Sequence, residues 1–252
     1  MTAAAATLAD APAQPAGFPG GMTAFASDFA ARSPLWTCGE CPFQFDVADG
    51  HARTLLIGGE NATGKSVLAE ALLRWAKEKF GCAPMKVTIR ERTGAGTYEM
   101  AAMRRQMMFG SEEKHSTGSV SAAVVGRAFL NMNNWAEQGV KPLLLLDEPE
   151  LGLSEGFSHA MGEWIGQQIG CLSGKAFGVI VVSHSKRLGK GLALGLSERP
   201  AFAQMDSVQA SFEQWLRDSQ PRTVDDLLAL DRLDAYGHRK MVEMIKAVRS
   251  MT

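Results

Sequence analysis

Hydrophobic and polar residues follow two repeating patterns along this chain, and each predicts a type of secondary structure. Apolar and polar side chains alternate over residues 43–47, and residues 54–57 form a short aliphatic run, so we expect two strands in this part of the chain. From 66 to 79 the apolar residues recur at helical spacing, which predicts a helix that ends at Gly81.

The same patterns recur in the middle of the chain. Alternation predicts a strand at 85–90, and helical spacing predicts helices at 120–135 and 157–169. Residues 142–146 and 179–182 are continuous aliphatic runs, typical of strands buried on both faces of a parallel sheet. Strands that alternate with helices in this way predict an α/β fold, with a mostly parallel sheet covered by helices on both faces.

The two ends of the chain differ from its middle. Residues 1–22 are rich in alanine and proline, and we expect a poorly ordered leader there. Residues 206–252 predict two helices that separate near Pro221 and pack on the same domain. The α/β domain itself is then expected to span residues 23–205.

Composition narrows the classes of protein. The 252 residues carry a formal net charge of −1 and 46% of them are hydrophobic, which is ordinary for one globular domain of 27.1 kDa. A net charge so close to zero argues against a protein that is held to nucleic acid by its overall charge. Binding of nucleic acid through a local basic patch is still open. The sequence has neither a long apolar run nor a secretory signal, so we expect a soluble protein without membrane insertion.

The four cysteines form no recognisable framework. Cys38 and Cys41 make one C-x-x-C, but a structural zinc site would need a second pair of ligands, which the sequence lacks. We interpret them as structural cysteines, with redox or metal chemistry as the alternative. This cysteine usage favours a reducing, cytoplasmic compartment.

A glycine-rich motif stands between the strand at 54–57 and the helix at 66–79. It reads G-x-x-x-x-G-K-S, in the strand–loop–helix context of a P-loop NTPase. Glycines let successive N–H groups turn toward phosphate oxygens, and the start of the helix adds partial positive charge. Lys65 is expected to reach the β- and γ-phosphates of ATP, and the hydroxyl of Ser66 to bind Mg²⁺. The expected nucleotide-binding residues are Gly59, Glu60, Asn61, Ala62, Thr63, Gly64, Lys65 and Ser66.

Two carboxylates end the aliphatic strand at 142–146. Asp147 is expected to hold Mg²⁺, and Glu148 to orient and polarise the attacking water. A solvated turn is the plain alternative for two acids at such a place. We expect this strand to lie beside the strand that delivers the glycine-rich motif.

The LLLLDEP segment and the G-x-x-x-x-G-K-S motif together resemble the ATP-binding-cassette (ABC) superfamily of ATPases. His184, just after the strand at 179–182, resembles the histidine of this family that contacts the γ-phosphate. Ser116 and Gly118 occupy two positions of the family signature, from which His115 and Ser119 depart. By themselves, Ser116 and Gly118 also fit an ordinary helix start, and His184 a surface turn.

The resemblance implies a homodimer. In this family two subunits close head to tail around two nucleotides, so Ser116 and Gly118 would bind the γ-phosphate of ATP held by the other protomer. Hydrolysis, with Lys65, Glu148 and His184 as the catalytic residues, would then release the dimer. Ser154 replaces the usual aspartate of the dimer-contacting loop, which puts communication between subunits at that point in doubt.

The resemblance is closest to soluble branches that do not drive transport, such as compact SMC- or RecF-like ATPases and those of phage or defence systems. Lys65 and Ser116 are only 51 positions apart, and Gln106 is the only candidate for a transporter's coupling glutamine. A protein partner, either an effector or a nuclease, is implied. Six basic and four acidic residues between 86 and 114 give weak support for DNA binding, and a solvated face is the alternative.

Other functions stay open at this point. The departures from the signature also fit a nucleotide-sensing regulatory subunit that hydrolyses ATP slowly. A transporter's ATPase subunit and a small-molecule kinase built on the same phosphate loop are further alternatives.

Overall fold

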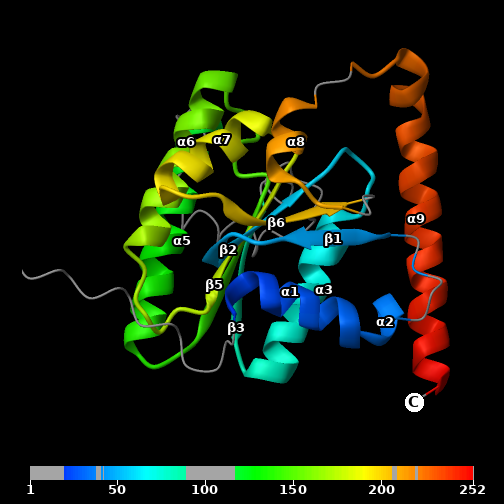
Figure 1. Ribbon diagram of the computed structural model, residues 1–252, viewed down its shortest axis with the longest axis horizontal. Coiled ribbons are helices and arrows are strands. Elements are labelled where there is room, and N and C mark those ends of the chain that lie inside the picture. Colours follow the sequence, from blue (N-terminus) through cyan, green and yellow to red (C-terminus); the bar gives the residue numbers. More distant parts are fainter. Residues whose placement is uncertain are drawn as a thin grey trace, which may run out of the picture.

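The computed structural model describes residues 20–37, 41, 43–88, 117–205, 209–218 and 221–251. Helices cover a central sheet from both sides (Figure 1). The strands are β1 (Phe45–Ala48), β2 (His51–Gly58), β3 (Ala83–Thr88), β4 (Pro142–Asp147), β5 (Gly178–Ser183) and β6 (Pro200–Met205). The helices are α1 (Gly21–Arg32), α2 (Pro34–Thr37), α3 (Lys65–Phe80), α5 (Thr117–Glu137), α6 (Glu155–Gly170), α7 (Lys186–Leu196), α8 (Phe212–Arg217) and α9 (Val224–Met251).

Within the described residues, the strands form one sheet in the order β1-β6-β2-β5-β4-β3. Four neighbouring pairs are parallel, and β1 is antiparallel to β6. The sheet is therefore mixed, where the sequence predicted a mostly parallel one. The connection after β1 is the reason: only Asp49 and Gly50 join it to β2, and so short a connection reverses the chain.

Gly50 lets this connection pass over the start of β6. A Cβ at Gly50 would lie 2.2 Å from the carbonyl carbon of Pro200, the first residue of β6. Only glycine fits so close to another backbone. β1 and β2 can thus stand on either side of β6.

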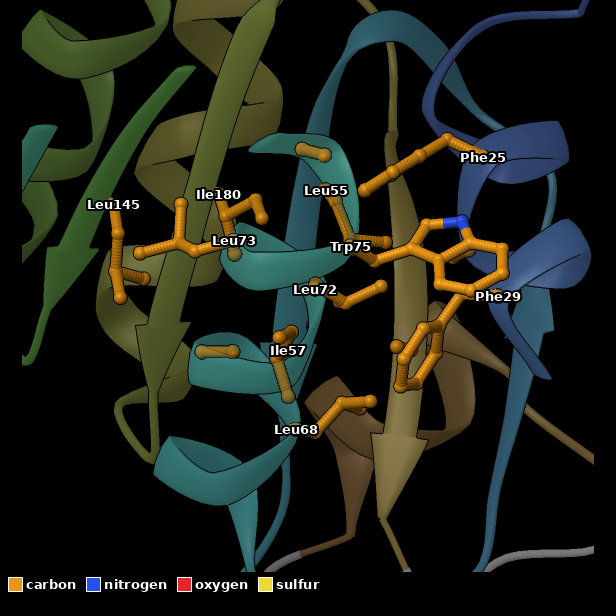
Figure 2. Close-up of a cluster of buried hydrophobic side chains, with 14 of the residues drawn as sticks. Phe25, Phe29, Leu55, Ile57, Leu68, Leu72, Leu73, Trp75, Leu145 and Ile180 are labelled. Carbon is orange, nitrogen blue, oxygen red and sulfur yellow. The ribbon is translucent and has the colours of Figure 1, made fainter. Parts of the chain in front are cut away.

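Side chains of the central strands alternate between two hydrophobic cores. Leu55 and Ile57 of β2 belong to the core that includes α1 and α3, whereas Leu56 belongs to the core that includes α5, α6, α7 and α8. Figure 2 shows Leu68 and Leu72 of α3 lying over β2 in the first core. The predicted coverage of the sheet on both faces is confirmed.

Aromatic side chains join α1 to this first core. Phe29 lies edge-on to Trp75 of α3, with 5.9 Å between ring centroids (Figure 2), and Phe25 meets Phe177 in a T-shape at 5.6 Å. The sequence pattern does not predict this helix, which begins at Gly21, within the expected leader.

The sequence pattern also does not predict α7, whose glycines pack against α6. A Cβ at Gly162 of α6 would lie 2.1 Å from the carbonyl oxygen of Leu188, and one at Gly191 of α7 would lie 2.0 Å from that of His159. The two backbones therefore touch. Glycine is a poor helix former, so the glycines that allow this contact also conceal the helix in the sequence.

The tail forms two helices, one on each side of Pro221, as predicted. α8 packs Phe212 and Trp215 into the second core, and α9 buries Met241 in the first. α9 stands at the side of the molecule, beyond β1 (Figure 1). No helix in the described parts of the chain is both long and apolar enough to cross a membrane.

Candidate active site

The loop between β2 and α3 bends sharply back on itself. Gly59, Ala62 and Gly64 have positive φ angles of 150°, 61° and 86°. The hydroxyl of Thr63 donates a hydrogen bond to the carbonyl oxygen of Glu60, at 2.9 Å. The shape of this segment, called the phosphate loop below, is thus set by its own backbone and by one short side chain.

Lys65 and the start of α3 close the loop. Lys65 is only 6% exposed, and its Nζ donates a hydrogen bond to the carbonyl oxygen of Glu60 at 2.5 Å. No side chain caps α3, and the half-buried Ser66 lies in its first turn. Uncapped N–H groups at the start of a helix attract anions, so a cation and a helix N-terminus converge on this loop.

Phe43 links the phosphate loop to the C-terminal helix. A Cβ at Gly64 would lie 2.5 Å from Cδ1 of Phe43, and a Cβ at Gly237 of α9 would lie 2.8 Å from Cζ of the same ring. Arg222, just before α9, is also 3.8 Å from a carboxylate oxygen of Glu60. Sequence reasoning missed this arrangement, because no local pattern connects residues so far apart in the chain.

The two predicted carboxylates lie at the end of β4 and are both buried. Asp147 is 5% exposed and Glu148 is 6% exposed. The backbone N–H of Glu148 donates to the carbonyl of Val182 in β5 at 3.0 Å, and its φ of 51° then turns the chain out of the strand. A positive φ is strained for a residue other than glycine, so the surrounding structure holds Glu148 in this position.

His184 follows β5 and faces Glu148. Its Nδ1 lies 3.6 Å from Oε1 of Glu148, a distance that fits an ion pair better than a hydrogen bond. The Glu148 carboxylate is the main cause that raises the pKa of His184, and Glu150 raises it further, whereas burial and the charge of Lys65 lower it. Lys65, Glu148 and His184 therefore lie within electrostatic reach of one another.

Glu150 is a buried acid beside this group that the sequence analysis did not select. Its Oε1 accepts a hydrogen bond from the hydroxyl of Ser183 at 2.5 Å, and its Oε2 has no hydrogen-bond partner within the described structure. Burial raises the pKa of Glu150, and the bond from Ser183 opposes that rise. An acid three residues after the end of β4 was the only signal of it in the sequence.

The strand order corrects one expectation about the site. β5 lies between β2 and β4, so the phosphate loop and the carboxylates are not on adjacent strands. Gly58 pairs with Ser183 and Asp147 pairs with Val182, so the three strands end at the same edge. α3 packs in the core on one face of the sheet and α7 in the core on the other, and ligands of open α/β sheets bind where helices diverge in this way at the carboxyl ends of strands.

Of the two signature residues expected to bind nucleotide, the structure describes Gly118. Ser116 lies outside the described residues, and Gly118 is in the first turn of α5. A Cβ at Gly118 would lie 2.6 Å from Cδ2 of Leu153, in the segment after the buried carboxylates. Ser154 immediately precedes α6, and its carbonyl accepts a hydrogen bond from the hydroxyl of Ser158 at 3.0 Å.

Several other predicted features fall partly or wholly outside the described residues. These include Gln106, Cys38 and most of the basic residues between 86 and 114. Of the described basic residues, Lys86 is paired with Glu70, and Arg187 lies 3.6 Å from Glu155. Each of these cations therefore has an acidic neighbour.

The donor set fits Mg²⁺ in the way that phosphate-binding proteins hold it. No three His, Cys, Asp or Glu residues in the described part of the chain are grouped to hold a metal by themselves. Mg²⁺ rarely needs such a cage, because it keeps its waters and binds one or two protein oxygens together with substrate phosphates. A serine hydroxyl and a buried carboxylate, Ser66 and Asp147, are donors of this kind.

Comparisons with known proteins identify no family for this chain. No family model and no curated protein match the sequence. Two chains of solved structure do match. One is the crystal structure of Cdc6p from Pyrobaculum aerophilum, which is 12% identical, with a TM-score of 0.31 over 58% of this chain. The match spans 38% of that protein, and a likeness at this level carries no argument about function.

Proposed function

We propose that this chain is an ABC-type ATPase, which binds ATP with Mg²⁺ and hydrolyses it to switch a partner. The observation that carries the proposal is the shared edge of β2, β5 and β4. There, Lys65 of the phosphate loop, His184 and Glu148 stand within electrostatic reach of one another. A loop with uncapped helical N–H groups, a cation and a buried acid together are what phosphoryl transfer to water requires.

Each group has a role in the proposed reaction. The phosphate loop and Lys65 bind the β- and γ-phosphates, and Ser66 with Asp147 would hold Mg²⁺, which neutralises charge on the phosphate oxygens. Glu148 accepts a proton from the attacking water. His184, whose raised pKa favours the charged imidazolium, places positive charge next to the departing phosphate.

We also propose that two copies close around the nucleotide, with Ser116 and Gly118 of one copy meeting the γ-phosphate bound to the other. The position of Gly118 in the first turn of α5, where helical N–H groups attract anions, supports this arrangement. The dimer would switch a protein effector, and DNA is the alternative target.

Replacement of Glu148 by glutamine tests the chemistry. Glutamine keeps the size of the side chain but cannot take the proton, so ATP hydrolysis should fall by about 10²–10⁴-fold while ATP binding persists. Glu155→Gln is the matched control, because Glu155 has an 84% exposed side chain outside the site. Normal turnover by the Glu148→Gln protein would remove the assignment, and ATP consumption that needs a phosphoryl acceptor would indicate a kinase.

The mass of the Glu148→Gln protein tests the dimer. At concentrations low enough for the nucleotide-free protein to be monomeric, we expect a monomer-to-dimer shift on addition of ATP and Mg²⁺, and no such shift when Lys65→Ala is added to the same protein. The measurement is repeated with duplex DNA and with candidate effectors. An unchanged mass under all conditions would contradict the ATP-bridged dimer.

A further inference from the structure

α9 presents several large apolar side chains to solvent. Among the described residues, eleven large hydrophobic side chains are exposed, and six of them lie on this one helix. The most exposed on α9 are Val224 at 71%, Leu228 at 67% and Leu227 at 64%. Single exposed apolar residues need no explanation, but a group of them on one element marks an interaction surface.

Part of this apolar surface forms a stripe on the side of α9 that points away from its own molecule. Val224, Leu228, Ala235 and Val242 follow one another at intervals of four, seven and seven residues, which keeps them within about 40° around a helix. Gly237, which contacts Phe43, is about 180° away from Leu228 around the same helix. α9 therefore docks by one face and leaves the opposite face, which we call the outer stripe, exposed.

The charges along α9 are asymmetric. Residues 224–237 contain four aspartates and one arginine, whereas residues 238–251 contain four lysines or arginines and one glutamate. The first half of the helix therefore carries a net charge of −3 and the second half +3. A helix with this pattern is complementary to a second copy of itself that runs in the opposite direction.

We propose that the outer stripe binds the outer stripe of a second copy, with the two α9 helices antiparallel. The register that centres on Ala235 sets Leu228 of each copy against Val242 of the other. It also sets Lys246 of each against the first turn of the other, which holds Asp225 and Asp226. The small side chain of Ala235 lets the helices approach where they cross, and the apolar residues on each side leave water.

This contact is independent of the ATP-bridged dimer proposed above, because it involves no residue of the phosphate loop or of the segment around Gly118. It would hold two chains together without nucleotide. A membrane surface is a poorer occupant, since the acidic first half of the helix would be repelled by anionic lipid.

The test is the mass of the full-length protein in the absence of nucleotide, measured by sedimentation over a range of concentrations. We expect a monomer–dimer equilibrium whose Kd rises at least about tenfold in Leu228→Glu. Leu233→Glu is the matched control: Leu233 is 53% exposed on the same helix, but about 140° away from Leu228, and should leave Kd unchanged. Circular dichroism checks that both variants are folded.

Two outcomes would overturn the proposal. One is a wild type that stays monomeric without nucleotide at every concentration, even if ATP then produces a dimer. The other is an equal loss of dimer in both leucine variants. Arg239→Glu with Lys246→Glu gives a second measurement that spares the apolar stripe, and it should also weaken the dimer, more strongly at low salt.

Cysteine cross-linking tests the orientation. In a background with all four native cysteines replaced, Leu228→Cys and Val242→Cys proteins should form a disulfide with each other when mixed. Neither should cross-link efficiently alone. Efficient cross-linking of each variant alone would indicate parallel helices and would overturn the antiparallel register.

Discussion

The hydroxyl of Ser183 donates a hydrogen bond to Oε1 of Glu150, and both side chains are buried at the edge of the sheet that carries the candidate site. The same Ser183 oxygen accepts the backbone N–H of Ser185 at 2.8 Å, and Ser185 caps α7. A short chain of bonds therefore joins the segment after β4 to the start of α7. His184 lies between its two serines, so these bonds fix the backbone that carries the imidazole.

Glu150→Gln should change how stability depends on pH. Burial raises the pKa of Glu150, so above pH 4.5 the unfolded chain loses this proton before the folded protein does, and wild-type stability falls as pH rises toward the folded-state pKa. Glutamine keeps an acceptor for Ser183 and has no proton to lose. We expect equal unfolding free energies near pH 4 and a more stable variant at pH 8.

Urea unfolding at several pH values measures this difference. Glu78→Gln, at an exposed position of α3, is the control for the loss of a glutamate outside the site. A Glu150→Gln protein that becomes less stable relative to wild type as pH rises would mean that the carboxylate is favoured in its charged form.

His184 should titrate at a lower pH once Glu148 loses its charge. The Glu148 carboxylate is the largest cause of the raised pKa of His184, so Glu148→Gln should lower that pKa, as followed by NMR of the imidazole. The stability that the raised pKa confers on wild type is fully present below pH 6.5 and is lost as pH rises through the folded-state pKa. His184→Gln should therefore be less stable than wild type at pH 6 and equal to it at high pH. An unchanged titration in Glu148→Gln would show that the two side chains do not interact in solution.

Gly64→Ala should destabilise the protein more than Gly81→Ala. Both glycines have positive φ, 86° and 65°, so both substitutions carry a backbone strain of about 1–2 kcal/mol. A Cβ at Gly81 meets nothing within 4 Å, whereas one at Gly64 would lie 2.5 Å from the ring of Phe43. Urea unfolding of the two variants isolates the effect of the ring. Equal losses of stability would show that Phe43 moves aside at no cost.

The sequence predicts the helices and strands that carry their own hydrophobic pattern, and it does not predict those that form only through their neighbours in the fold. The buried aliphatic strands and the helix after the phosphate loop each carry their own pattern, so β2, α3, β4 and β5 were predicted close to their observed bounds. β6 was missed, because Pro200–Met205 contains two alanines and a glutamine and is a strand only through its position between β1 and β2.

The candidate site also contains some residues that a local motif identifies and some contacts that no local motif identifies. Lys65, Asp147 and Glu148 belong to contiguous motifs, and the sequence was enough to select them. The insertion of β5 between β2 and β4, the contact of Phe43 with Gly64, and the buried position of Glu150 depend on which strands and helices become neighbours. Contacts between residues that are far apart in the sequence produce no periodic pattern of hydrophobic and polar residues.

The glycines of α6 and α7 give a last prediction, in which one substitution has opposite effects at two positions. Alanine is the better helix former by about 1 kcal/mol, so Gly156→Ala in α6 should stabilise the protein, because a Cβ there meets nothing within 4 Å. In Gly191→Ala the new methyl group would lie 2.0 Å from the carbonyl oxygen of His159, so the helices must separate, at a cost of about 1–3 kcal/mol or more. Thermal unfolding of both variants compares the two signs directly. A stabilised Gly191→Ala protein would contradict the close contact of the two helices, since helix propensity alone would then decide the outcome.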